Sequence, residues 1–141
     1  MRLAVAAALL AASALAFAQS GARETATRLV ALLSEGNIED AAALSNHPQR
    51  RREVLEDYRK RVGDEEFRRI YAHYLKGRIV DEIADGKHRL VIWDLGNHFA
   101  GQFFVEKDGR FLLDDEPSEA RNRLRRALAD YRKARASGRK D

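Results

Sequence analysis

Asp81 and His88 are the residues of this chain whose types and spacing could support catalysis. They flank the turn dipeptide Asp85-Gly86, and a two-residue loop there would pair Asp81 with Leu90, diagonal to His88. A carboxylate that holds an imidazole in an apolar pocket can make it a general base. We therefore predict this pair as the catalytic candidate, with protection of an edge strand by an inward-pointing Asp81 as the structural alternative.

Aromatic side chains in the helical and strand segments could line a binding pocket. Three tyrosines at helical spacing carry phenol groups that can hydrogen-bond a ligand, although core packing is the alternative at that spacing. Two phenylalanines and Asp94 are predicted on one sheet face, where Asp114 also falls near a strand end. The candidate ligand-binding residues are Tyr58, Tyr71, Tyr74, Phe99, Phe103 and Asp94.

The sequence contains no pattern typical of a metal or phosphate site. Its four histidines lack a spacing such as H-x-x-x-H, and it has no cysteine. It also has no Gly-rich phosphate-binding loop and no G-x-S-x-G nucleophile motif. We therefore expect no metal and no cofactor.

The C-terminal segment is strongly basic. Residues 119–141 contain nine Lys and Arg against three Asp and Glu, a net charge of +6, whereas the whole chain has a net charge of +4. Such a helix can bind anionic lipid, lipopolysaccharide phosphate or an acidic protein, and a solvated face on an ordinary docking helix is the alternative. The candidate residues for an anionic surface are Arg121, Arg125, Arg126, Arg132, Lys133 and Arg135.

Residues 1–18 have the pattern of a cleaved secretory signal. Arg2 precedes an Ala- and Leu-rich run, and Ala16-Phe17-Ala18 matches an A-x-A cleavage site. The run of about 13 apolar residues is shorter than the roughly 20 that span a membrane. We predict cleavage after Ala18 and a periplasmic or secreted bacterial protein, with an N-terminal helix as the alternative. Nucleic acid is not an expected partner of an exported protein.

Apolar residues at helical spacing predict helices over 25–33, 38–44, 50–62 and 65–76. Gly36 and Gly77 are predicted to end the first and the last of them. Arginines 50–52 are expected to precede the first ordered turn of their helix, because positive charge there opposes the macrodipole. A basic helix is predicted to follow the N-cap Ser118, so that 19–116 form the domain and 117–141 an added helix and tail.

Three turn dipeptides between residues 77 and 115 separate four apolar runs, which predicts an antiparallel meander. A two-residue loop at Gly96-Asn97 pairs Leu90 with Phe103, and one at Asp85-Gly86 places Glu82 opposite Arg89. Ile79 is assigned to the face of Leu90 and Val80 to the other face. Since both faces carry apolar side chains, helices must cover one, and the C-terminal helix or a second subunit the other.

This order of helices followed by a curved meander resembles the nuclear transport factor 2-like superfamily. The resemblance rests on the opening residues 33–42, on the closing hairpin 104–114, and on its Lys107-Asp108-Gly109 turn followed by an aromatic residue. It implies a cone-shaped α+β fold with a pocket between sheet and helices, and frequent dimerisation through the outer sheet face. It implies no single activity, because the fold carries isomerases, dehydratases, ligand binders and adaptors.

Taken together, these features predict a noncatalytic exported module that binds a small apolar ligand or a partner protein, and the family resemblance adds a homodimer through the outer sheet face as an open alternative to a monomer. One alternative is a pocket enzyme of the isomerase or dehydratase type that uses Asp81 and His88. The other is association with an anionic envelope surface through the C-terminal helix.

Overall fold

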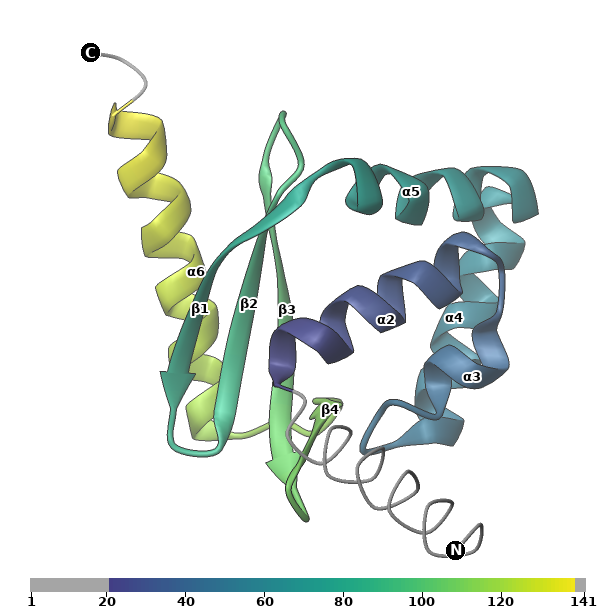
Figure 1. Ribbon diagram of the computed structural model, residues 1–141, viewed down its shortest axis with the longest axis horizontal. Coiled ribbons are helices and arrows are strands. Elements are labelled where there is room, and N and C mark those ends of the chain that lie inside the picture. Colours follow the sequence, from purple (N-terminus) through teal and green to yellow (C-terminus); the bar gives the residue numbers. More distant parts are fainter. Residues whose placement is uncertain (1–20, 139–141) are drawn as a thin grey trace, which may run out of the picture.

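The computed structural model describes residues 21–138. The predicted signal peptide and its cleavage site lie outside the described residues. Residues 21–138 form helices followed by strands and a final helix (Figure 1). The elements are α2 (Ala22–Ser34), α3 (Ile38–Ala42), α4 (Pro48–Val62), α5 (Asp64–Lys76), β1 (Arg78–Asp85), β2 (His88–Asp94), β3 (Phe99–Lys107), β4 (Arg110–Leu113) and α6 (Glu119–Gly138).

The fold is α+β, with helices on both faces of a four-stranded antiparallel sheet. The strands follow one another in the order β1-β2-β3-β4, as a meander does. Helices α2 to α5 lie on one side of the sheet and α6 lies on the other (Figure 1). We call these sides the inner and the outer face. The predicted fold class is therefore confirmed, including the separate C-terminal helix.

Two predicted helix ends are confirmed by their hydrogen bonds. Gly36 has a φ of 75°, and the amides of Gly36 and Asn37 donate to the carbonyls of Leu33 and Leu32 at 3.0 and 2.9 Å. This is the Schellman pattern, which favours glycine at the left-handed position. Ser118 caps α6, since its hydroxyl accepts from the backbone N–H of Arg121 at 3.0 Å.

The prediction for arginines 50–52 is wrong, because α4 begins at Pro48 and includes all three. Acceptors from outside the helix compensate their charges. The Arg50 guanidinium donates to the backbone carbonyl of Asp115 at 3.2 Å, and Arg51 pairs with the carboxylate of that residue. Arg52 lies 3.7 Å from a carboxylate oxygen of Glu39. Contacts from α3 and from the segment after β4 thus outweigh the unfavourable macrodipole.

The predicted register of the second hairpin is confirmed. Leu90 pairs with Phe103, and Ile92 with Gly101. The loop has a positive φ at Gly96, the first of its two residues, as a type II′ turn requires. The last hairpin turns at Asp108 and Gly109, which both have positive φ, as in a type I′ turn.

The predicted register of the first hairpin is wrong by two residues. Asp85 pairs with His88, so the loop is Gly86 and Lys87, and only Gly86 has a positive φ. Glu82 consequently lies opposite Val91 and not opposite Arg89. An irregularity between Ile79 and Asp81 then shifts the pairing by one residue. Such a bulge changes the face to which the neighbouring side chain points.

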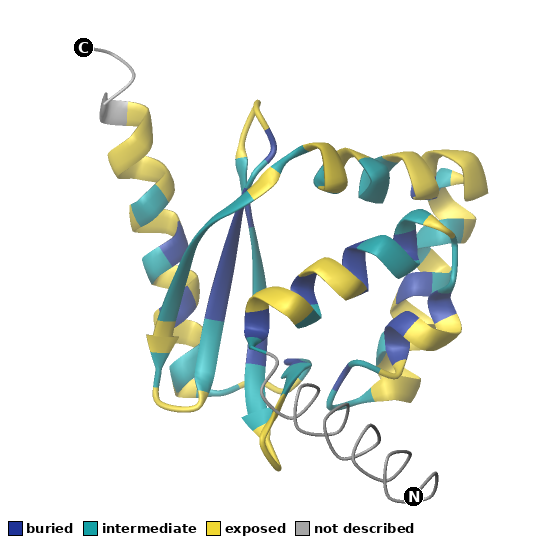
Figure 2. Ribbon diagram, in the orientation of Figure 1, coloured by how far each residue is buried: buried dark blue, intermediate teal, exposed yellow. Residues whose placement is uncertain are grey.

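The inner face carries the larger core. Phe67, Phe104 and Val91 are fully buried there, and Trp93 is 3 % exposed. Ile79 packs against this core and not, as predicted, against the residues around Leu90, because of the bulge in β1. Buried positions are concentrated on β2 and on one side of α2 (Figure 2).

On the outer face, α6 covers a smaller core. Leu124 and Leu128 of α6 pack on Leu90 and Ile92, and Val80 joins them. Val80 thus lies on the face opposite to the predicted one. A Cβ atom on Gly101 would lie 2.6 Å from a methyl carbon of Leu128, so glycine permits this close approach. The face predicted to form a homodimer is occupied by α6 of the same chain, and the dimer stays a prediction.

None of the helices within residues 21–138 combines the length and the apolar composition that crossing a membrane requires.

Candidate ligand-binding cleft

A cleft lies beside β3, where the inner helices and α6 approach each other. β4 pairs only with residues 104–107 of β3, so residues 99–103 have no strand on that side within the described chain. Side chains from α2, α4 and α5 line the cleft together with residues of β3 and α6, and its volume is about 400 Å³. Its apolar and aromatic lining includes Leu29, Leu33, Leu55, Tyr71, Tyr74 and Phe103.

A row of aromatic rings fixes the two tyrosines of the cleft. The ring of Tyr71 lies 5.0 Å from that of Phe67 and 5.8 Å from that of Tyr74, whose other neighbour is Trp93 at 5.6 Å. Burial raises the pKa of Tyr71 to about 12 and also raises the pKa of Tyr74. Both phenols therefore keep their protons at neutral pH and can donate hydrogen bonds.

Arg51 and Asp115 form an ion pair at the cleft. The Arg51 Nε donates to the Asp115 Oδ2 at 3.1 Å, and its Nη2 donates to the Oδ1. The hydroxyl of Ser45 donates to the same carboxylate. The two side chains are 25 % and 8 % exposed. The positive charge of Arg51 is therefore neutralised within the protein.

Asp114 joins three parts of the chain at the cleft. Its carboxylate accepts from the Asn46 side chain at 3.1 Å and from the backbone N–H of Glu116 at 3.1 Å, and it lies 3.2 Å from the Nδ1 of His88. Its side chain is only 2 % exposed. These contacts tie β2 and the segment before α4 to the start of α6. The carboxylate is thus part of the scaffold that shapes the cleft.

The structure does not bring Asp81 and His88 together. Asp81 pairs with Ile92, four residues along β2 from His88, which corresponds to about 13 Å at the usual rise of a strand. The two-residue shift in register is the cause. Asp81 instead accepts a hydrogen bond from the backbone N–H of Glu82 at 2.8 Å, and His88 takes Asp114 as its partner. The expected diagonal contact is therefore wrong.

Arg121 and Arg125 of α6 bring positive charge to the cleft. The Nη1 of Arg121 donates to the backbone carbonyl of Asp114 at 3.2 Å, whereas its buried Nε has no hydrogen-bond partner among the described residues. The Arg125 guanidinium lies over the ring of Phe103, 5.8 Å from its centroid. Neither forms an ion pair within residues 21–138. A buried donor without an acceptor costs about 1–3 kcal/mol.

The other predicted ligand-binding residues lie elsewhere. Tyr58 packs edge-on against Phe67, with the ring centroids 5.9 Å apart, as part of the inner core. Phe99 contacts Tyr131 of α6 at 5.3 Å, and with Asp94 it lines a second hollow on the outer side. The Asp94 carboxylate accepts from the backbone N–H of Gly96 at 2.9 Å, as in an Asx-turn.

The other four residues of α6 that are predicted to bind an anionic surface divide into two groups. Arg132 donates to the backbone carbonyl of Phe99 at 2.9 Å, and Arg135 stacks on Tyr131 at 4.6 Å, so both hold α6 to the sheet or to itself. Arg126 and Lys133 are exposed.

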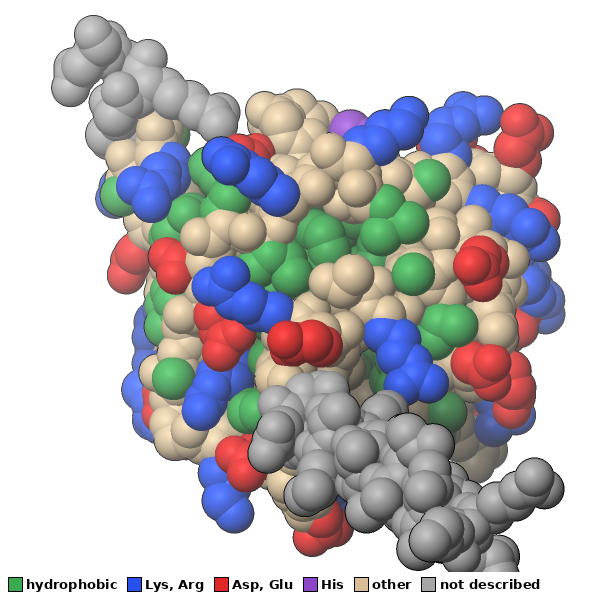
Figure 3. Space-filling model, in the orientation of Figure 1, with side chains coloured by type: hydrophobic (Ala, Val, Ile, Leu, Met, Phe, Trp, Pro, Cys, Tyr) green, Lys and Arg blue, Asp and Glu red, His purple; other side chains and the backbone are tan. Residues whose placement is uncertain are grey.

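The face that carries α2 and β1 mixes Lys and Arg with Asp and Glu around a central group of hydrophobic side chains (Figure 3).

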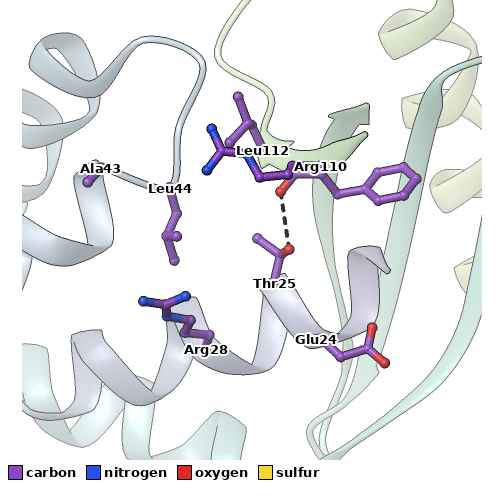
Figure 4. Close-up of a pocket in the computed structure, with 8 residues that line it drawn as sticks. Glu24, Thr25, Arg28, Ala43, Leu44, Arg110 and Leu112 are labelled. Atoms are coloured by element: carbon purple, nitrogen blue, oxygen red, sulfur yellow. Dashed lines mark hydrogen bonds between the residues drawn. The ribbon is translucent and has the colours of Figure 1, made fainter. Parts of the chain in front are cut away.

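A smaller cavity lies between the start of α2, the end of α3 and β4 (Figure 4). Thr25 and Leu44 line it, and the Thr25 hydroxyl donates to the backbone carbonyl of Phe111 at 3.1 Å. Its volume of about 90 Å³ corresponds to about three water molecules. It is too small for a metabolite.

Within the described chain, no three His, Cys, Asp or Glu side chains gather as metal ligands would.

Sequence reasoning missed the charged residues that close the cleft. Arg51 was assigned to a segment before its helix, and Asp115 was given no role. The sequence contains both sets of charges, because it has a basic triplet at 50–52 and an acidic run at 114–116. Only the contact of these segments in the fold makes them partners.

In comparisons with protein-family models, curated proteins and solved structures, nothing matched the chain.

Proposed function

We propose that this chain is an exported, noncatalytic module that binds a small ligand in the cleft beside β3. The observation that carries the proposal is a cleft of about 400 Å³ whose lining includes Tyr71 and Tyr74, with Arg121 and Arg125 on its α6 side forming no ion pair within residues 21–138. Ligand pockets typically measure about 300–1,000 Å³ and combine an apolar lining with a few polar groups. The apolar ligand expected from the sequence thus gains polar contacts at one end.

Similarity to the nuclear transport factor 2-like superfamily is part of this proposal. The α+β architecture, with helices α2 to α5 packed on one face of an antiparallel meander, supports it. That architecture is compatible with many activities, so the cleft and not the fold supports the assignment as a binder.

The noncatalytic assignment is favoured by the contacts of the polar groups. Asp81 has no histidine partner, and the carboxylate of Asp114 is engaged by Asn46, Glu116 and His88. A general base needs a free lone pair within reach of the substrate proton. Periplasmic or secreted localisation rests on the N-terminal signal pattern and is proposed on that ground alone.

Native and denaturing mass spectrometry of the mature protein, purified from its own cell envelope, tests the proposal. We expect a noncovalent small molecule that is lost on denaturation, and an N-terminus at Gln19. Tyr74→Ala should reduce retention of this molecule. Tyr131→Ala is the matched control, because Tyr131 is a partly buried tyrosine outside the cleft. A bare protein, or equal losses in both variants, would contradict cleft binding.

Association with an anionic envelope surface is the second candidate, and exposed Arg126 and Lys133 favour it. We expect the double variant Arg126→Glu with Lys133→Glu to lose co-sedimentation with vesicles that contain anionic lipid. The matched control is Lys60→Glu with Lys76→Glu on α4 and α5, because both lysines are exposed. Unchanged co-sedimentation of the α6 variant would exclude this role.

A further inference from the structure

We propose that the cleft selects an amphipathic anion, whose carboxylate or phosphate binds between Arg121 and Arg125 while its apolar body lies against Tyr71 and Tyr74. The proposal rests on the proposed function, because it names the chemical class of the ligand that the cleft holds. Within the described chain, the carboxylates of the cleft have partners, whereas Arg121 and Arg125 form no ion pair.

The acidic side chains of the cleft are already engaged. Asp115 pairs with Arg51 and accepts from Ser45. Asp114 accepts from Asn46 and from the backbone N–H of Glu116, and it contacts His88. Neither carboxylate forms an ion pair with a residue of α6 within the described chain. The two arginines of α6 are therefore the cations that a ligand could neutralise.

The guanidinium of Arg121 offers an unused donor. Its Nη1 bonds to the backbone carbonyl of Asp114 at 3.2 Å, which fixes one edge of the planar group. Its Nε is buried and has no acceptor among residues 21–138. An arginine presents donors in a rigid fork that matches the two oxygens of a carboxylate or phosphate. An anion would supply the acceptor that the Nε lacks.

Arg125 stands one helical turn after Arg121, on the same face of α6. Two like charges at positions i and i+4 repel each other, unless an opposite charge lies between them. Phe103 holds the Arg125 guanidinium by contact with its ring at 5.8 Å, so the side chain stays at the cleft. Arg121 also lies in the first turn of α6, at the positive end of its dipole, which adds to the attraction for an anion.

The rest of the lining favours an apolar body on this anion. Leu29, Leu33 and Leu55 of the inner helices also line the cleft, although each is at most 3 % exposed. Tyr71 and Tyr74 add aromatic surface and neutral hydroxyl donors. An inorganic ion would leave this part of the cleft unfilled, whereas an aromatic or short-chain acid would fill both parts.

Isothermal titration calorimetry with matched pairs of probes tests the proposal. The anionic probes are benzoate, hexanoate and phenyl phosphate, and the neutral probes are benzyl alcohol, hexanol and phenol, with inorganic phosphate alone as a further probe. We expect at least one anionic probe to bind more tightly than its neutral counterpart by about tenfold to hundredfold, as hydrogen bonds to charged groups allow. Added salt should weaken binding of the anion only.

Arg121→Gln and Arg125→Gln should each remove most of this preference, with Arg126→Gln as the control on the same helix outside the cleft. Arg121→Lys keeps the positive charge but loses the planar guanidinium with its fixed donors. We therefore expect it to lose less of the preference for the anionic probe than Arg121→Gln does. Equal urea midpoints for the variants and the parent protein would show that folding is retained. If Arg121→Gln does not fold, the salt dependence of binding and the Arg125→Gln variant still test whether the cleft selects an anion.

The outcomes separate the two proposals. Equal binding of neutral and anionic probes, unaffected by either arginine, would overturn the anion selectivity and leave the cleft as a binding site. Failure of every probe to bind would overturn the anion proposal, and a bare protein in native mass spectrometry would overturn cleft binding as well. A preference for phenyl phosphate over benzoate would identify the anionic group as phosphate.

Discussion

The two faces of the sheet are closed in different ways. On the inner face, four helices bury a broad core that includes Phe67, Phe104 and Trp93. On the outer face, the one helix α6 buries a narrow core around Leu90 and Ile92. The inner layer can therefore supply most of the folding free energy, while α6 covers the second face and brings Arg121 and Arg125 to the cleft.

The largest loss is expected for Phe67→Ala in the inner core. Phe67 is fully buried and contacts the rings of Tyr58 and Tyr71. Removal of a buried aromatic ring costs about 3–5 kcal/mol of unfolding free energy. Urea denaturation measures this loss. Leu75→Ala on the same helix is the control, since Leu75 is 46 % exposed and should change the free energy by less than about 0.5 kcal/mol. Similar losses in both variants would break the assignment of Phe67 to the core.

A smaller and more local loss is expected for Leu124→Ala on the outer face. Leu124 is 2 % exposed, and its truncation should cost about 2–3 kcal/mol. In hydrogen exchange, amides of α6 should lose protection before those of α2 and α5, because α6 packs mainly on the sheet through the small outer core. Simultaneous loss of protection in all helices would show that the two layers fold as one unit.

Gly101→Ala tests the close approach of α6 to β3. The new Cβ atom would lie 2.6 Å from a Leu128 methyl carbon, and such overpacking costs about 1–3 kcal/mol. In a Leu128→Ala background the same substitution should cost less, because the clashing methyl group is gone. A double-mutant cycle measures this coupling. Additive effects of the two substitutions would contradict the contact.

Alkaline pH should destabilise the inner layer through Tyr71. Its pKa is raised by burial to about 12, so its neutral form stabilises the fold. This contribution is complete below the ordinary value of about 10 and is lost as the pH rises towards 12. Tyr71→Phe should flatten this part of the stability profile, with Tyr131→Phe as the control. Spectroscopic titration of the phenols measures the pKa directly.

The smallest effect is expected for Arg123→Gln on the exposed side of α6. Arg123 donates to Asp85 at 2.7 Å, and this hydrogen bond lowers the pKa of Asp85 below its ordinary value. The contribution is present above that ordinary value and is lost as the pH falls through the lowered pKa. Both side chains are solvated, so the melting temperature should change little at neutral pH and not at all in strong acid. A large change would assign this pair a role in holding α6.

Local sequence determined most of the elements and one of the registers. The apolar spacing placed the helices and strands within a few residues, and Ser118 and Gly36 marked helix ends that the structure confirms. The Gly96-Asn97 loop gave the correct pairing of Leu90 with Phe103. These features depend on neighbours in the chain, so the sequence pattern contains the necessary information.

The local sequence does not determine the register of the first hairpin. Asp85-Gly86 and Gly86-Lys87 are both acceptable two-residue loops, and the structure uses the second, in which glycine takes the first position of the turn. The choice moved Asp81 away from His88, and the bulge exchanged the faces of Ile79 and Val80. A shift by two residues leaves every side chain on its own face, so neither the turn residues nor the apolar pattern distinguishes these registers, and the contacts made in the folded protein decide between them.

The composition of the candidate cleft was decided by tertiary structure alone. The sequence indicated Tyr71, Tyr74 and Phe103 as pocket residues and Arg121 and Arg125 as surface residues, in two separate predictions. The fold joins these sets, because β4 is short and α6 crosses the outer face beside the free edge of β3. The sequence by itself determined the elements and their apolar faces through local spacing. Only long-range packing decided which charged groups meet their partners and which stay available at the cleft.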